Sequence, residues 1–117
     1  MSRAQCDKLL PMDTYSLIRE AIEKRQQVLA TYRGYHREMC PHAIGFNKRH
    51  ERQGLFYQFA GESSSGLGPP GSPENWRCIP IDELHNVSVR DGEWLSASDH
   101  TRPQTCVFHQ LDLEARP

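Results

Sequence analysis

Five short segments rich in β-branched and aromatic residues follow one another between residues 28 and 89. Parallel strands need connections of about a dozen residues or more, usually a helix. The connections here are either shorter or, at residues 61–75, too rich in glycine, serine and proline to form a helix. The segments therefore predict an antiparallel sheet with strands at residues 28–32, 37–44, 55–60, 76–81 and 85–89.

A single amphipathic helix is expected before these strands, in the stretch DTYSLIREAIEKRQQ at residues 13–27. Either Asp13 or Thr14 is a suitable N-cap, because both side chains accept hydrogen bonds from the first free amides of a helix. Polar and charged side chains occupy the opposite face. The apolar stripe consists of Leu17, Ile18, Ala21 and Ile22.

The order of the loops, the turn and the strands along the chain indicates a more specific fold class. A polar loop is expected at residues 47–54, an exposed and mobile loop at 61–75, and a short helical turn at 82–84. Pro41 is expected at an edge or a bulge of the second strand. A small antiparallel sheet hides its edges by curling closed. We therefore predict a mainly β fold with an N-terminal α-helix and a five-stranded antiparallel barrel of the SH3/Sm-like type.

The chain has the length of one domain, at 117 residues. We divide it into an N-terminal tail at 1–12, the helix and barrel at 13–95, and a C-terminal tail at 96–117. At most one short amphipathic helix is expected in that tail, because Val107, Phe108 and Leu111 stand at helical spacing. Two arrangements of the tail stay open: packed on the barrel, or extended free of it.

The cysteines and the apolar content of the sequence indicate where in the cell the protein is expected. Cys6, Cys40, Cys78 and Cys106 lie far apart with no CxxC pair, so we expect reduced, mostly structural thiols. The first residues lack the apolar stretch of a secretory signal, and no window reaches the roughly 18 apolar residues of a membrane span. The sequence predicts a cytoplasmic protein with no membrane association.

Scattered positions along residues 14–95 resemble the WYL domain, a bacterial Sm/SH3-like barrel. The first hairpin of that family carries a tyrosine, an arginine and a proline in the order found here, and the tyrosine of its naming tripeptide is kept in Phe56-Tyr57-Gln58. An arginine also precedes its tight turn, although Glu83 stands here where the family has a basic residue. The matching residues are Tyr32, Arg37, Pro41, Tyr57 and Arg77.

The resemblance implies a sensory or regulatory module that binds a ligand or nucleic acid, commonly in transcription regulation. The family's usual DNA-reading helix-turn-helix has no room here, so sequence-specific DNA binding is not expected. Arginine forks suit phosphate or carboxylate, and tyrosine rings suit stacking. The expected ligand-binding residues are Tyr32, Arg37, Tyr57 and Arg77. The alternative is that both tyrosines are core residues and both arginines are surface charges.

A local excess of positive charge lies between residues 24 and 52, where seven Lys and Arg residues face two acids. Its densest part is the predicted loop at 47–54, and Lys48, Arg49 and Arg52 are candidate phosphate contacts. A solvated hairpin loop is the alternative reading of the same residues.

Catalytic and metal chemistry have little support in the sequence. His36, Cys40, His42 and His50 lie close together, but Cys40 and His42 supply only two zinc ligands. No nucleophile elbow, phosphate loop or paired carboxylates occur, so we expect no enzyme, cofactor or metal. The predicted function is a non-catalytic binding module for an anionic ligand, either a nucleotide or nucleic acid. The alternative is a protein-interaction module or homo-oligomer.

Overall fold

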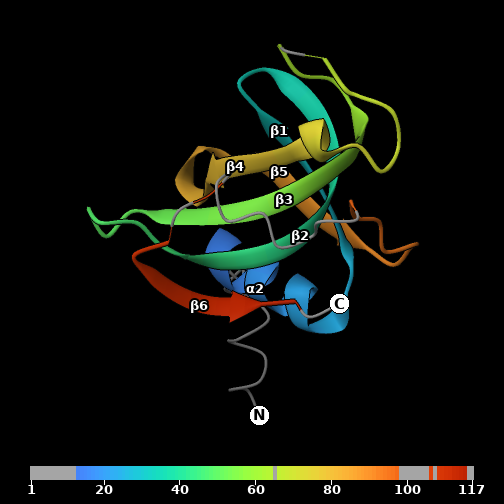
Figure 1. The fold of residues 1–117 in the computed structure, drawn as a ribbon. Helices are drawn as coiled ribbons and strands as arrows, with labels where there is room; N and C mark the ends of the chain where they lie inside the picture. The colour runs from blue at the N-terminus through green and yellow to red at the C-terminus, as the bar shows by residue number, and fades with distance from the viewer. Residues whose placement is uncertain (1–12, 65, 98–105, 107, 116–117) are drawn as a thin grey trace.

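The computed structural model describes residues 13–64, 66–97, 106 and 108–115. One helix and a curved, antiparallel, six-stranded sheet make up this part of the chain (Figure 1). The predicted N-terminal tail at 1–12, with Cys6, and the predicted helical position Val107 lie outside the described residues.

The predicted helix is confirmed as α2, Thr14–Lys24. Asp13 is its N-cap, and the carboxylate Oδ1 accepts from the Ser16 amide at 2.8 Å. The helix ends where Arg25 adopts the left-handed conformation, earlier than the predicted end at residue 27. Its buried side chains Ile18, Ala21 and Ile22 all belong to the predicted stripe. No helix in the described ranges is long and apolar enough to cross a membrane.

All five predicted strands form, and a sixth strand joins them. The sheet order is β4-β3-β2-β1-β5, and β6 pairs with β2 away from this path. Among the described residues no ladder connects β4 with β5, so the sheet is not closed. The strands are β1 (Gln27–Tyr32), β2 (Tyr35–Phe46), β3 (Arg52–Gly61), β4 (Trp76–Pro80), β5 (His85–Arg90) and β6 (Gln110–Glu114).

The long strand β2 holds the sheet together by pairing on both of its edges. Its first part pairs with β1 up to Met39, and its last part pairs with β6 from Ala43 onward. On its other edge it pairs with β3, and the register shifts between Pro41 and Ala43. Pro41 thus lies at an irregularity where its missing N–H is tolerated, as predicted.

The helix that the spacing of Phe108 and Leu111 allowed does not form at Leu111. Gln110–Glu114 is the strand β6, and it runs antiparallel to the end of β2. The physical reason is a partner far away in the sequence: Gly45 of β2 has no side chain, and this lets β6 approach closely. A Cβ at Gly45 would lie 2.4 Å from the backbone oxygen of Gln110. The tail therefore packs on the sheet, one of the two arrangements left open.

Both faces of the sheet are covered along its central strands β2 and β3. One face packs on α2 around Phe56, Met39 and Ile44. The opposite face is covered by the segment after β5, through Leu95 and Ala97, and by Cys106. The residues buried in this second cluster are Ala43, Leu55, Tyr57, Trp76, Ala97 and Cys106.

The connections match the predicted types, but the polar loop predicted at 47–54 ends earlier, because β3 already begins at Arg52. The short turn before β5 is a 3-10 helix, η2 (Ile81–Glu83), and a second 3-10 turn, η1 (Pro73–Asn75), precedes β4. The described part of the loop before β4 is largely exposed, as predicted. Asn75 nonetheless ties it back, because its side-chain oxygen accepts from the Gly68 amide at 2.8 Å. The mobility of this loop stays a prediction.

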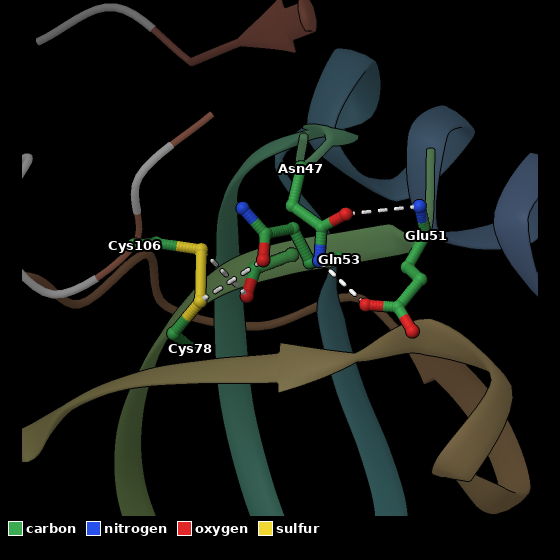
Figure 2. Close-up of a disulfide and its surroundings, with 6 residues drawn as sticks. Asn47, Glu51, Gln53, Cys78 and Cys106 are labelled. Carbon is green, nitrogen blue, oxygen red and sulfur yellow. Dashed lines mark hydrogen bonds between the residues drawn. A yellow bond between two sulfur atoms is a disulfide. The ribbon is translucent and has the colours of Figure 1, made fainter. Parts of the chain in front are cut away.

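The expectation of reduced thiols was wrong for two of the four cysteines. Cys78 of β4 and Cys106 form a disulfide across 28 positions of sequence, with a Cα–Cα distance of 5.0 Å (Figure 2). No local pattern signals this pair, because only the return of the tail along β2 brings Cys106 to β4. Cys40 is a buried free thiol, and burial raises its pKa to about 11.

A polar contact anchors β6 to the helix. The carboxylate of Asp112 accepts from the Tyr15 hydroxyl at 2.6 Å and from Arg19 Nε at 3.2 Å. These bonds, the first above all, hold the pKa of Asp112 below its usual value. Burial raises the pKa of Tyr15, and the hydrogen bond to Asp112 raises it further.

Asp112 predicts a pH dependence. A lowered folded pKa gives stability that is complete above the unfolded pKa of about 4 and is lost as the pH falls through the folded pKa. We expect Asp112→Asn to be less stable than wild type by up to about 1 kcal/mol at pH 7 and nearly equal to it near pH 2. Thermal unfolding of both proteins from pH 7 to pH 2 measures the gap. Parallel curves over the whole range would contradict this role.

Candidate functional site

Arg37, a predicted ligand contact, lies inside the fold. The residue is 4% exposed, whereas both sequence-based interpretations, a ligand contact or a surface charge, require an accessible side chain. Nη1 donates to Gln58 Oε1 at 3.3 Å and Nη2 donates to the backbone oxygen of Tyr32 at 3.3 Å. The guanidinium also lies 4.9 Å from the centre of the Tyr32 ring. Arg37 and Tyr32 are thus neighbours, as predicted, but Arg37 is hardly accessible to a ligand.

Arg77 meets Arg37 at the same acceptor. Its Nε donates to Gln58 Oε1 at 3.2 Å, so one amide oxygen serves both arginines. Its terminal nitrogens donate to the backbone oxygens of Glu74 at 2.6 Å and Gly66 at 3.0 Å. Arg77 therefore fastens the loop between β3 and β4 to the sheet.

This arginine cluster, defined here as Arg37, Gln58 and Arg77, has unusual electrostatics. No carboxylate among the described residues pairs with either arginine. Burial lowers the pKa of both guanidinium groups, and the charge of Arg77 lowers that of Arg37 further. Most of the donors already meet protein oxygens. The cluster is therefore best explained as a structural polar network within the fold.

Tyr57, the fourth predicted ligand contact, is separate from this cluster. Its side chain is buried in the core on the opposite face of the sheet, where its ring packs edge-on against Trp76 with centroids 5.1 Å apart. Its hydroxyl donates to the backbone oxygen of Ser72 at 2.9 Å. Of the four predicted residues, three come together and Tyr57 does not; Tyr57 is a core tyrosine with a satisfied hydroxyl.

The turn between β2 and β3 presents the predicted phosphate contacts. The side chain of Asn47 shapes this turn, because its Oδ1 accepts from the amides of Arg49 at 2.8 Å and Glu51 at 3.0 Å. Its Nδ2 donates to Glu51 Oε1 at 2.8 Å (Figure 2). A single side chain thus fixes the backbone that carries Lys48 and Arg49, both of which are exposed.

A pocket of about 470 Å³ opens beside this turn. The tail supplies its other wall through Phe108 and His109, just before β6. The His109 amide donates to the backbone oxygen of Phe46 at 2.8 Å, which aligns this wall with the end of β2. The pocket is lined by Asn47, Lys48, Arg49, Glu51, Phe108 and His109, and we call it the turn pocket.

The three basic residues around the β2–β3 turn differ in whether they form an ion pair. Lys48 and Arg49 make no ion pair with any acid in the described part of the chain. Arg52, the third predicted phosphate contact, is instead paired with Asp82 and lies over the ring of Tyr15. It lines a smaller neighbouring pocket of about 190 Å³ that also contains acidic side chains. Two of the three predicted contacts therefore share the turn pocket.

Sequence reasoning missed Phe108 and His109 as lining residues. Phe108 was noted only as part of an expected helix, and His109 was not noted. Their position depends on the pairing of β6 with β2 and on the disulfide, which are long-range features. The alternating Leu111 and Leu113 were the one local sign that a strand follows them.

The Cys40-Pro41-His42 segment has a structural task. His42 is buried, and its Nε2 donates to the backbone oxygen of Leu95 at 3.3 Å. The Leu95 amide in turn donates to Cys40 Sγ at 3.2 Å. Both side chains thus hold the segment that covers the second core, with Trp76 and Trp94 packed around the imidazole. Over the described ranges, no three His, Cys, Asp or Glu residues converge as metal ligands.

Similarity to known proteins adds nothing to these observations. No protein-family model, curated protein or solved structure matches this chain. The WYL resemblance therefore stays a prediction, and the functional conclusions below rest on the turn pocket and its charges.

Proposed function

We propose that this chain is a non-catalytic binding module for an anionic ligand of nucleotide type, which it holds in the turn pocket. The observation that carries the proposal is the pairing of two cations, Lys48 and Arg49, with an aromatic wall, Phe108 and His109, around one cavity. The cations suit phosphate groups and the wall suits a flat ring.

The size of the pocket agrees with this proposal. Ligand sites in proteins usually occupy about 300–1,000 Å³, and the turn pocket measures about 470 Å³. Its one acidic side chain, Glu51, is hydrogen-bonded to Asn47. Two cations and one carboxylate line the turn pocket, so an anion placed near Lys48 and Arg49 meets a net charge of +1 when His109 is neutral.

The turn is also prepared for binding. Two amides and one carboxylate are held by Asn47, so the backbone of the turn is already ordered. A ligand then loses little affinity to the ordering of a loop. Only the exposed side chains of Lys48 and Arg49 need to be fixed.

The second part of the proposal is that this curved sheet, although open between β4 and β5, is of the SH3/Sm-like barrel type. After four strands in meander order, the 3-10 turn η2 leads β5 back to pair with β1. This is the arrangement expected for that class, with α2 packed on one face. A WYL-like sensory or regulatory role is proposed on the same basis.

The proposal is tested by calorimetric titration with ATP as the probe. We expect Lys48→Ala/Arg49→Ala to weaken ATP binding by about tenfold or more and to flatten its dependence on salt concentration. Lys24→Ala is the matched control, because it removes an exposed cation on α2 that is paired with Glu20 and lines no part of the pocket. Equal losses in both variants, or no salt-sensitive binding to wild type, would contradict the proposal.

A further inference from the structure

The disulfide stands directly before the aromatic wall of the turn pocket. Cys106 is 3% exposed and is joined to Cys78 of β4. Phe108 and His109, the two lining residues from the tail, follow Cys106 by two and three positions. Cys78 Sγ lies 3.8 Å from Oε1 of Gln53, which follows Glu51 of the turn by two positions (Figure 2). One covalent bond thus fixes the chain at the point where it enters the pocket wall.

The non-covalent contacts of the strand that follows are few. β6 has five residues, pairs with β2 alone among the described strands, and leaves Leu111 50% exposed. Asp112 adds the contact with α2, but its side chain is 30% exposed. A short strand on an edge, with mostly exposed side chains, is expected to open locally with a low free energy.

We propose that the Cys78–Cys106 disulfide is a redox latch that holds β6 and the wall of the turn pocket in place. The consequence for a ligand rests on the function proposed above. While the bond is intact, Phe108 and His109 are kept beside the turn. When it is reduced, β6 leaves β2 and the pocket loses that wall.

The reductant required is a dithiol. Its thiolate attacks Sγ of Cys78, which is half-buried, whereas Cys106 is buried. The S–S bond breaks, and Cys106 leaves as a thiolate that takes up a proton. The second thiol of the reductant then attacks the mixed disulfide and releases Cys78. Two cysteine thiols form, and the dithiol becomes a disulfide.

The latch is tested by hydrogen exchange on the full chain, oxidised with glutathione disulfide or reduced with dithiothreitol. The amides of His109 and Ala115 report on β6, since they donate to the backbone oxygens of Phe46 and His42. Strand β1 serves as the internal reference. We expect reduction to lower the protection of both reporter amides by about tenfold or more and that of β1 far less. In Cys78→Ser/Cys106→Ser, the protection of both reporter amides should equal that of the reduced protein and should not change when dithiothreitol is added.

The outcomes separate this proposal from the proposed function. Unchanged protection at His109 and Ala115 would overturn the latch, and so would an equal fall over the whole sheet. ATP titrations of both redox forms test the link to the pocket. If ATP binds the oxidised form and loses about tenfold in affinity on reduction, the link is supported; equal affinity would overturn it. If ATP binds neither form, the proposed function fails, and exchange alone decides the latch.

Discussion

Replacement of Gln58 by leucine is expected to lower the free energy of unfolding by about 3 kcal/mol or more. Gln58 is fully buried, and its Oε1 is the shared acceptor of Arg37 and Arg77. Its Nε2 donates to the backbone oxygens of Ala60 at 3.1 Å and Glu62 at 3.2 Å. Leucine would leave two guanidinium groups and two carbonyls short of a partner, and no described carboxylate forms an ion pair with either arginine.

Arg37→Met is the matched control for Gln58→Leu. Methionine fills a similar elongated space and removes a buried charge whose Nε already lacks a partner in the described part of the chain. We expect a change within about 1 kcal/mol, because Gln58 keeps its bond to Arg77. Urea unfolding of both variants measures the contrast. If Arg37→Met proved as costly as Gln58→Leu, the arginine and not the amide would organise the cluster.

Gly45→Ala is expected to detach β6 and to lower the free energy of unfolding by about 2–3 kcal/mol. A Cβ at this position would lie 2.4 Å from the Gln110 oxygen and 2.9 Å from a ring carbon of Phe108. The Gln110 oxygen belongs to the backbone, so the strand itself must move. Because Phe108 lines the turn pocket, ATP binding should weaken together with stability.

Gly34→Ala separates this steric effect from a general effect of losing a glycine. Gly34 lies in the β1–β2 turn at φ +81°, and a Cβ there meets nothing within 4 Å. Alanine at Gly34 should cost about 1 kcal/mol through its backbone conformation and leave the protection of the His109 amide unchanged. Retention of that protection in Gly45→Ala would contradict the close approach of β6.

Local patterns were enough to predict the helix and the first five strands. The apolar stripe of α2 and the alternation in β3 each reflect packing that is decided within a few residues. Asp13 could be recognised as an N-cap candidate for the same reason. The antiparallel arrangement followed from the short connections alone.

The features that were missed depend on contacts between distant residues. β6 can pair with β2 because Gly45 has no side chain to block its close approach. Cys78 is oxidised because Cys106 of the C-terminal tail lies beside β4. In both cases the two partners are far apart in the sequence, so the residues around one do not indicate the other. The burial of Arg37 was missed for a related reason. An arginine on a strand is usually exposed, and here Gln58 on the neighbouring strand and the backbone oxygen of Tyr32 supply the buried acceptors.

The two basic regions differ in what their charges can do. In the arginine cluster, the guanidinium groups are already engaged with Gln58 and backbone oxygens. At the turn pocket, Lys48 and Arg49 extend into solvent from a backbone that Asn47 holds. Burial and prior partners, not the number of basic residues, therefore favour the turn pocket as the ligand site.

The most direct test of this assignment is a titration of the ¹⁵N-labelled, oxidised chain with ATP, followed by amide chemical shifts. We predict that the largest, salt-sensitive shifts fall on Lys48, Arg49 and His109, which surround the turn pocket. Shifts concentrated instead on Arg37 and Arg77, or no shifts at concentrations where ATP binds, would contradict it.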